Sequence, residues 1–514
     1  MTNKKKEIKR KYVGPIAMVI ILTIAIMITT SLLSLFGLDA QKAVVVTTKY
    51  ADIPYTVEMT MTIVKNIFSL DGLKFLITNV VLNFSVFEPL MLFVIVLMAF
   101  SLAETSGLFK RVFNRLKKVK INKLNFFLLL LSIISSFFGE YSYIIVLPLS
   151  AIIYKYARKN PVLGIIISFI GITIGGGAGL IFNYNDLLLG LKTEMAANVG
   201  RNNSYVYNVN STLFISLAST FLLSIFGTKI IEHFLLSKID NHVELDEEEE
   251  TITKEAKLTS LAVFVIMLLL LIYSITPGFP ASGILLDMNQ KTYMQQLMVE
   301  GSPFREGFIF IVSSILIITS LAYGYFNKKI KNSHDFSFGL TSEFNQLGYL
   351  FVMMFFISQM TAIINWTNIG EVVTAKFTQM LSTVQFTGLP LIILLMMVVI
   401  VVTFIMPSTL EKWKLMSPVV IPLFMRANIT PSFTQLIFVV FDGIGKLLTP
   451  LFIYYLIMIA FLQKYKKEEE KFTVFGVMRM TLPTILYMSA VWALIILGWY
   501  IVGLPLGINV LPTI

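Results

Sequence analysis

The sequence contains no cysteine and only three histidines among its 514 residues. Without cysteine it has neither a disulfide framework nor thiol chemistry. The histidines, His233, His242 and His334, are scattered and lie in or next to polar segments, so no metal site is predicted. No constellation of nucleophile, acid–base pair or metal ligands stands out, and a membrane enzyme would need one. We therefore expect no enzyme activity and no cofactor.

Apolar residues dominate what the sequence does contain. Hydrophobic residues make up 56% of the chain and charged residues 14%, and the mean hydropathy is +0.79. Soluble proteins carry roughly 25% charged residues, so this composition predicts an all-α polytopic membrane protein with the lipid bilayer as a partner. The net charge of +11 comes from lysines and arginines clustered between apolar runs. That pattern indicates cytoplasmic loops and not a nucleic-acid-binding surface.

The apolar runs predict about nine transmembrane helices and two re-entrant helical hairpins. A lysine-rich segment precedes the first run, residues 13–38, so the N-terminus is predicted to be cytoplasmic, in a bacterial plasma membrane. The hairpins are predicted at residues 124–155 and 388–427, where two short apolar arms flank a polar tip. Residues 40–87 are only intermittently apolar, so they are interpreted as an external connection with an interfacial helix around residues 73–84.

A segment that begins with proline follows each hairpin and combines an acid with glycines. The first, residues 161–191, holds a glycine-rich stretch and Asp186, and the second, residues 431–463, holds Asp442 beside two glycines. We predict that the glycines and a nearby proline break both helices at bilayer depth, where free backbone groups must line a site. Because a charge at that depth costs at least a few kcal/mol, Asp442 is interpreted as a lone functional acid. Asp442→Asn is accordingly expected to leave folding intact.

The order of these elements repeats along the chain and predicts four regions. They are a first span with its external connection (1–86), a first repeat (87–235), a cytoplasmic loop with linking spans (236–342) and a second repeat (343–514). The first hairpin is predicted to open inward and the second outward, which makes the repeats inverted. Inverted repeats with broken helices are typical of secondary transporters that work by alternating access. A channel is less favoured, because it would need a continuous polar pore.

Several stretches of both repeats resemble the p-aminobenzoyl-glutamate transporter family, AbgT. The similar stretches are residues 359–370, 408–425 with Lys412-Trp413 and Ser417-Pro418, and 435–450 with Asp442, and in the first half residues 104–107, 143–149 and 185–196. The resemblance implies a homodimer that takes up p-aminobenzoyl-glutamate or exports sulfonamide antimetabolites, coupled to an ion gradient. It also implies roles for Asp186, Asn368, Ser408, Trp413, Pro418, Asp442 and Pro450.

The chain departs from the family pattern at five other positions. Val439 stands where the family usually has arginine, Leu410 where it has serine, and Glu411 where it has a small residue. Lys446 replaces an asparagine, and Glu140 replaces an aspartate at the tip of the first hairpin. These departures affect the expected substrate and not the expected fold.

The function predicted from these features is ion-coupled secondary transport of small aromatic carboxylates. The alternative is a carrier for another small carboxylate, either a dicarboxylate or a short-chain fatty acid. Proton and sodium coupling, and import and export, all remain open. The residues predicted to bind the anionic substrate are Asn368, Ser408, Trp413, Pro418, Asp442, Lys446 and Pro450, and those predicted to couple the ion are Asp186 and Asp442.

Three of these assignments leave alternatives open. Trp413 is predicted to place its ring against substrate, because the tip of an outward-opening hairpin dips toward the midplane, and an interfacial belt position is the alternative. Glu411 and Lys412 either serve the site or pair locally. Val439, Asp442 and Lys446 share one helical face, so Lys446 either restores the charge lost at 439 or neutralises Asp442.

Overall fold

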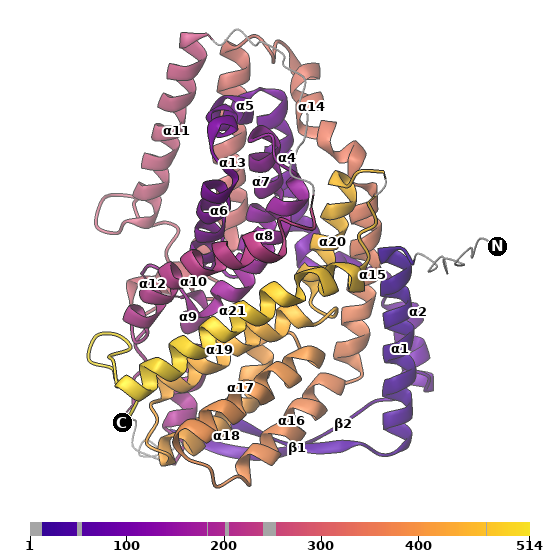
Figure 1. Cartoon of the computed structure of the whole chain (residues 1–514), viewed down its shortest axis with the longest axis vertical. Coiled ribbons are helices and arrows are strands. Elements are labelled where there is room, and N and C mark those ends of the chain that lie inside the picture. Colours follow the sequence, from indigo (N-terminus) through magenta and orange to yellow (C-terminus); the bar gives the residue numbers. More distant parts are fainter. Residues whose placement is uncertain (1–12, 49–53, 182, 201–204, 240–252, 469) are drawn as a thin grey trace, which may run out of the picture.

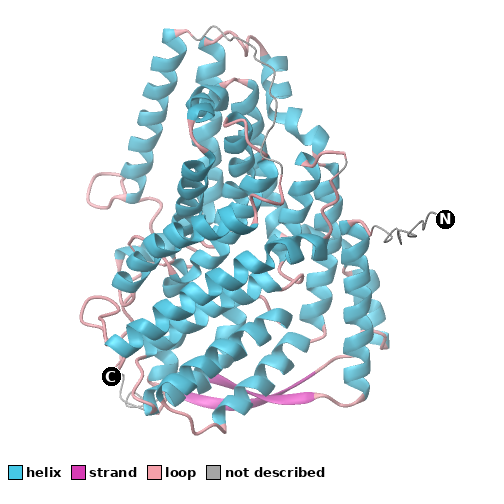
Figure 2. Cartoon of the chain, in the orientation of Figure 1, coloured by secondary structure: helices cyan, strands magenta, loops and turns pink. Residues whose placement is uncertain are grey.

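The computed structural model describes residues 13–48, 54–181, 183–200, 205–239, 253–468 and 470–514. Most of this structure is helical, and the described residues contain one two-stranded sheet (Figure 2). Ten of the described helices are long and apolar enough to cross a membrane. The predicted all-α, multi-pass membrane architecture is therefore confirmed. The ten are α1 (Pro15–Leu35), α4 (Glu88–Thr105), α6 with the turn that follows it (Ile121–Phe138), α10 (Leu213–Phe234), α11 (Lys254–Ile275), α13 (Pro303–Phe326), α15 (Gly348–Trp366), α17 (Gly388–Ile405), α19 (Pro431–Leu448) and α21 (Val474–Val502).

The N-terminal region holds a β hairpin that the sequence pattern did not predict. Its elements are α1 (Pro15–Leu35), β1 (Asp39–Thr47), β2 (Tyr55–Ile63), α2 (Leu70–Thr78) and α3 (Val80–Ser85). The strands pair antiparallel, from Asp39 opposite Ile63 to Thr47 opposite Tyr55. The β-branched run at residues 44–47 and the alternation of apolar and polar residues in 55–63 are sequence signals that could have predicted the two strands. The β hairpin packs against α16 and α18 at one end of the molecule (Figure 1).

The two repeats contain the same series of helices in the same order. The first repeat comprises α4 (Glu88–Thr105), α5 (Leu108–Phe113), η1 (Asn114–Lys118), α6 (Ile121–Ser135), η2 (Ser136–Phe138), α7 (Tyr141–Tyr156), α8 (Pro161–Ile174), η3 (Gly175–Gly177), α9 (Tyr184–Ala197) and α10 (Leu213–Phe234). The second comprises α15 (Gly348–Trp366), α16 (Ile369–Ser382), α17 (Gly388–Ile405), α18 (Thr409–Arg426), α19 (Pro431–Leu448), α20 (Ile453–Tyr465) and α21 (Val474–Val502). Between them lie α11 (Lys254–Ile275), α12 (Tyr293–Met298), α13 (Pro303–Phe326), α14 (Ser333–Thr341) and η4 (Ser342–Gln346).

The two repeats interlock through their broken helices. The first half of each, α8 or α19, packs against both arms of its own hairpin, α6 and α7 or α17 and α18. The second half reaches into the other repeat, because α9 packs against α18 and α20 packs against α7 and α8. This exchange brings residues of both hairpin tips and both helix breaks to the lining of one cavity.

The break in the second repeat does not lie at the glycines, so that part of the prediction was wrong. Helix α19 runs through Gly443 and Gly445 to Leu448, and the chain leaves the helix at Thr449, which is extended just before Pro450. A residue before proline disfavours the helical conformation, so Pro450 causes the break. In the first repeat the glycines do end the helix, because α8 stops at Ile174. Helix α19 has 18 residues and α8 has 14, so the second repeat gains about one turn, and this turn contains Lys446.

The glycines of α19 permit close helix packing instead. A Cβ atom at Gly443 would lie 2.5 Å from the backbone oxygen of Thr173 in α8. One at Gly445 would lie 2.6 Å from the Thr403 Cβ in α17. At these points α19 touches its neighbours through its backbone, so the two glycines set the depth at which α8 and α17 pack on α19.

We predict that Gly443→Ala lowers the stability of the protein by about 1–3 kcal/mol, because the new methyl group overpacks against an oxygen that only a backbone shift can move. The matched control is Gly498→Ala in α21, where a Cβ would meet nothing within 4 Å. That control should be neutral or stabilising, because alanine is favoured over glycine in helices by about 1 kcal/mol. Thermal unfolding of the purified protein in detergent compares the two variants. Equal midpoints would show that the contact at Gly443 is not tight.

Candidate functional site

A central cavity of about 240 Å³ lies where the hairpin tips and the broken helices meet. The tip of the first hairpin contributes Glu140 and Tyr143, and the start of α18 contributes Ser408. Helix α19 contributes Val439, Asp442 and Lys446, which face the cavity together as their spacing predicted. Other lining residues come from the first helix break, the second helix break and the outer helices, and they include Thr173, Asn185, Phe452, Glu88, Glu300 and Arg305.

A second cavity of about 430 Å³ adjoins the first. The two share Glu140, Ser408 and Phe452, which therefore form the wall between them. Asn368 lines only the second cavity, at the turn from α15 into α16. This residue has a positive φ of 58°, and its side-chain amide lies 3.4 Å from the Ile63 carbonyl of β2.

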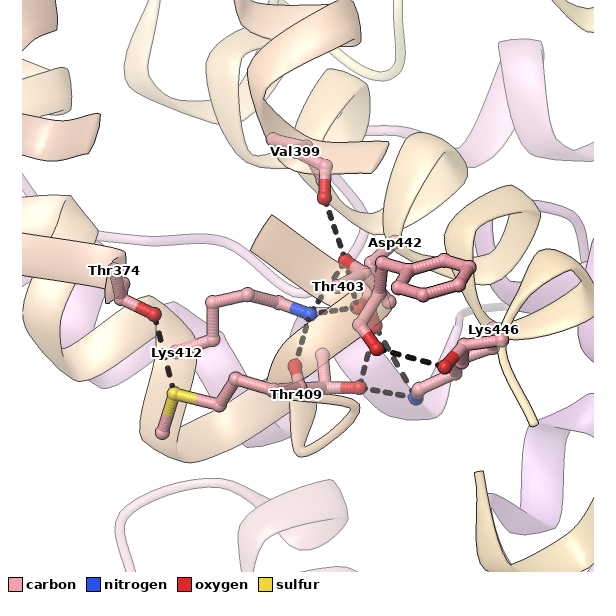
Figure 3. Close-up of polar contacts among 10 residues, drawn as sticks. Thr374, Val399, Thr403, Thr409, Lys412, Asp442 and Lys446 are labelled. Atoms are coloured by element: carbon pink, nitrogen blue, oxygen red, sulfur yellow. Dashed lines mark hydrogen bonds and ion pairs between the residues drawn. The ribbon is translucent and has the colours of Figure 1, made fainter. Parts of the chain in front are cut away.

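Asp442 is not a lone acid, so the expectation that it lacks a partner was wrong. Its Oδ1 lies 2.5 Å from the Lys412 Nζ, and its Oδ2 lies 3.2 Å from the Lys446 Nζ (Figure 3). The hydroxyls of Thr403 and Thr409 lie 3.1 Å from Oδ1 and 2.6 Å from Oδ2. Both oxygens of the carboxylate are therefore occupied, and α19 is tied to both arms of the second hairpin.

Lys412 is the partner that the sequence did not identify. Its side chain is 0% exposed. Its ammonium group donates to Thr403 Oγ1 at 2.6 Å, to the Met406 carbonyl at 2.8 Å and to Asp442. Those three bonds use every proton that a lysine ammonium carries. The neighbouring Glu411 does pair locally, with Lys414 at 2.6 Å on the surface.

Lys446 differs from Lys412 because it faces the central cavity. Its side chain is 16% exposed, and its ammonium also donates to the Thr409 hydroxyl. One carboxylate thus lies between two ammonium groups, and Lys412 already neutralises it. The floor of the cavity consequently carries one formal positive charge, presented by Lys446.

Asp186 lies in a separate buried network and lines neither cavity. Its Oδ2 accepts a hydrogen bond from Thr212 at 2.5 Å, and its Oδ1 accepts one from Gln435 of α19 at 2.9 Å. Thr193 of α9 donates to the side-chain oxygen of Gln435. The indole N–H of Trp413 donates in turn to the Thr193 hydroxyl at 2.9 Å. A directed chain of hydrogen bonds therefore joins Trp413 on the second hairpin to Asp186 in the first repeat.

The structure places Trp413 in neither of its two predicted positions. The side chain is 0% exposed, which contradicts an interfacial belt position. The ring packs against Phe438 at a centroid distance of 4.4 Å and lines neither cavity, so it does not contact a ligand in either of them in this conformation. Pro418, inside α18, and Pro450, at the break after α19, also line neither cavity.

The aromatic wall of the central cavity comes from residues that the sequence analysis did not single out. Tyr143 and Phe452 both line the cavity, and their rings meet edge to face at 5.6 Å. Tyr143 also stacks on Tyr454 at 4.5 Å, and its hydroxyl donates to Thr173 at 2.9 Å. In the sequence, the position of Phe452 two residues after Pro450 was the only signal that could have predicted its place in the cavity. Of the predicted substrate residues, the structure gathers Ser408, Asp442 and Lys446 in this cavity.

Across the described ranges of the chain, no three histidine, cysteine, aspartate or glutamate side chains come together in a group able to hold a metal ion. The charged residues that line the central cavity are Glu88, Glu140, Glu300, Arg305, Asp442 and Lys446.

Comparison with known proteins assigns the chain to a family. A family model described as "AbgT putative transporter family" matches residues 6–513. The p-aminobenzoyl-glutamate transport protein of Escherichia coli (strain K12) is 27% identical over 510 residues, which cover 99% of this chain and 96% of that protein. Two solved structures are also similar. The YdaH transporter of Alcanivorax borkumensis is 23% identical, with a TM-score of 0.48, and the match covers 96% of this chain and 100% of that one. MtrF of Neisseria gonorrhoeae, presented as one of a class of antimetabolite efflux pumps, is 24% identical, with a TM-score of 0.47 and coverage of 98% of each chain. Since the family model spans almost the whole sequence, the chain belongs to the AbgT family of transporters.

Proposed function

We propose that this transporter carries small aromatic carboxylates, of the chemical class of p-aminobenzoyl-glutamate, by ion-coupled alternating access. We further propose that it acts as a homodimer in a bacterial plasma membrane, with a cytoplasmic N-terminus. The observation that carries the substrate class is the ammonium of Lys446, which faces the central cavity beside an acid, Asp442, that Lys412 already neutralises. The name of the Escherichia coli relative supports the same class of substrate.

The charge on the cavity floor favours an anionic group. Lys412 is fully buried and donates its three hydrogen bonds to Asp442, Thr403 and the Met406 carbonyl. It therefore serves as the counter-ion of Asp442. Lys446 keeps access to the cavity, where a substrate carboxylate can replace the 3.2 Å contact with Asp442 Oδ2. A hydrogen bond to a charged group contributes about 1.5–3 kcal/mol, which is enough to orient a small anion.

The start of α18 adds a second feature that suits an anion. Ser408 is the N-cap residue, but its side chain makes no capping hydrogen bond, and it lines both cavities. Unpaired N–H groups at a helix N-terminus carry a partial positive charge. The N-terminus of α18 and the Lys446 ammonium can therefore both contact one carboxylate group of the substrate.

The aromatic wall favours an aromatic substrate over a short-chain fatty acid or an aliphatic dicarboxylate. Tyr143 and Phe452 offer both a ring face and a ring edge to the cavity. Aromatic pairs in these geometries gain about 0.5–1.5 kcal/mol beyond the area that they bury.

Counterflow in proteoliposomes tests the proposed function. Vesicles with purified protein are preloaded with unlabelled p-aminobenzoyl-glutamate, p-aminobenzoate, succinate or butyrate, and entry of the labelled compound is followed. We expect exchange of the aromatic carboxylates. Exchange of only succinate or butyrate would replace the substrate class with the alternative carrier. Equilibration without counterflow would indicate a channel, and an altered product would indicate an enzyme.

We predict that Tyr143→Leu weakens binding of p-aminobenzoyl-glutamate relative to glutamate-like aliphatic anions by roughly 2- to 13-fold, because ring contacts are lost. Tyr143→Phe keeps the ring and controls for the hydroxyl bonded to Thr173.

Trp413→Phe keeps a ring but removes the N–H donated to Thr193, so it should slow transport of every substrate equally. Equilibrium binding and initial rates separate the two effects. A selective loss of aromatic substrates in Trp413→Phe would return Trp413 to the role predicted from the sequence.

A further inference from the structure

Neither aspartate that was predicted to couple the ion has an oxygen free to receive a cation. Asp442 Oδ1 is contacted by Lys412 and Thr403, and its Oδ2 by Lys446 and Thr409, all within 3.2 Å. Asp186 is 2% exposed, lines neither cavity and has both oxygens bonded, to Thr212 and to Gln435. A cation at either acid would first have to displace these buried partners. Coupling of a cation to substrate transport therefore requires another carboxylate, one that lines the cavities.

Glu140 is a carboxylate that the fold places in that path. It lies at the tip of the first hairpin, and it is exposed within the wall that the two cavities share. Its Oε2 accepts a hydrogen bond from the Tyr454 hydroxyl at 3.1 Å, and Tyr454 belongs to α20 of the other repeat. The preceding Gly139 has a φ of +58°, and a Cβ there would lie 2.5 Å from the Tyr184 ring, so the turn that presents Glu140 is tightly constrained.

Other charged and titratable groups surround Glu140 on several elements. Glu88 of α4 faces the same cavity, and Glu300 and Arg305 line it from the segment at the start of α13. Tyr141 and Tyr143 follow on the hairpin itself, Tyr454 approaches from α20, and Lys446 lies on the floor. Among these groups, Glu140 is the carboxylate that lines both cavities. A cation held there is accessible from either of them.

Charge balance links Glu140 to substrate binding. Within the group Asp442, Lys412, Lys446 and Glu140, two negative and two positive charges cancel. A substrate carboxylate at Lys446 adds one negative charge, and a net charge is costly in a low-dielectric site. One cation on Glu140 offsets that charge without any contact with Asp442.

We propose that Glu140 binds the coupling cation, a proton or a sodium ion, at the wall between the two cavities. This inference rests on the proposed carboxylate transport, whose substrate anion occupies Lys446. The Tyr454 hydroxyl holds the unloaded carboxylate in place, and loading replaces or shares that hydrogen bond. Asp442 then maintains the anion site, and Glu140 couples it to the gradient.

Glu140→Gln tests the proposal in proteoliposomes of the full-length protein. We expect the variant to retain counterflow of p-aminobenzoyl-glutamate but to lose accumulation against its gradient. Imposed pH gradients and imposed sodium gradients, applied separately, identify which ion drives the wild type. Glu140→Asp keeps a carboxylate and should retain accumulation, and Glu58→Gln, an exposed change on β2, should behave as the wild type.

A binding measurement provides a readout that does not depend on transport. With a pH indicator in weakly buffered detergent solution, substrate addition to the wild type should take up protons if the ion is a proton. If it is sodium, sodium should raise the thermal midpoint of the wild type as mass action requires. Glu140→Gln should abolish whichever response occurs. Gradient-driven accumulation by Glu140→Gln, or an unchanged response in it, would overturn the proposal for Glu140. Absence of counterflow in the wild type would instead refute the proposed function.

Discussion

Asp442→Asn is expected to destabilise the protein by about 3–5 kcal/mol, because it leaves Lys412 buried without its counter-ion. The ammonium of Lys412 is 0% exposed and lies 2.5 Å from the carboxylate that the substitution removes. An asparagine oxygen accepts a hydrogen bond there but carries no charge. Thermal unfolding in detergent should show a clear fall in the midpoint. This expectation reverses the one drawn from the sequence, where Asp442 was interpreted as a lone acid and the pairing with Lys412 was not identified.

The double variant Asp442→Asn with Lys412→Met should recover most of this loss. Replacing a buried ion pair with apolar groups is often neutral, whereas breaking it is costly, so the two single changes should be strongly non-additive. Lys414→Met provides the control, since the Lys414–Glu411 pair is exposed and contributes about 0–1 kcal/mol. If Asp442→Asn unfolds at the same temperature as Lys414→Met, the buried pair does not stabilise this fold.

Lys446→Asn is expected to weaken binding of anionic substrate by roughly 10- to 150-fold, because it removes a charged hydrogen-bond donor from the cavity floor. Adding Val439→Arg should recover binding, because residues 439 and 446 line the same cavity two helical turns apart. The recovered site should prefer p-aminobenzoyl-glutamate, since arginine presents a fork that matches a carboxylate and lysine presents a point charge. Isothermal titration or a thermal-shift series with each substrate measures both effects.

Two controls separate charge from packing in this experiment. Lys414→Asn removes an exposed lysine of the same hairpin and should bind substrate normally. Val439→Met together with Lys446→Asn adds bulk at 439 without charge and should not recover binding. If Lys446→Asn alone binds anions normally and only its pH dependence moves, Lys446 is a counter-ion of Asp442 and the cavity floor is not the anion site.

The sequence was sufficient to predict the elements whose signals are local. Runs of apolar residues predicted the spans, and basic clusters and proline starts at Pro161 and Pro431 predicted where each repeat begins its broken helix. The sequence was not sufficient to predict the position of the second break. Glycines such as Gly443 and Gly445 occur both where a helix breaks and where it packs closely on a neighbour, so the local sequence does not distinguish the two cases. The neighbours Thr173 and Thr403 decide between those outcomes, and both come from other helices.

The composition and the apolar runs by themselves determined that this protein is an all-α polytopic membrane protein, because helix length and apolar content depend on nearby residues alone. Only the tertiary structure decided which charges are paired and which are free. Lys412 and Asp442 are 30 residues apart, and the packing of α17, α18 and α19 brings them within 2.5 Å. The same packing turns Trp413 away from the cavity and leaves Lys446 facing it. The physical reason is that ion pairing depends on which side of each helix faces inward and at what depth, and that is set by contacts between distant segments.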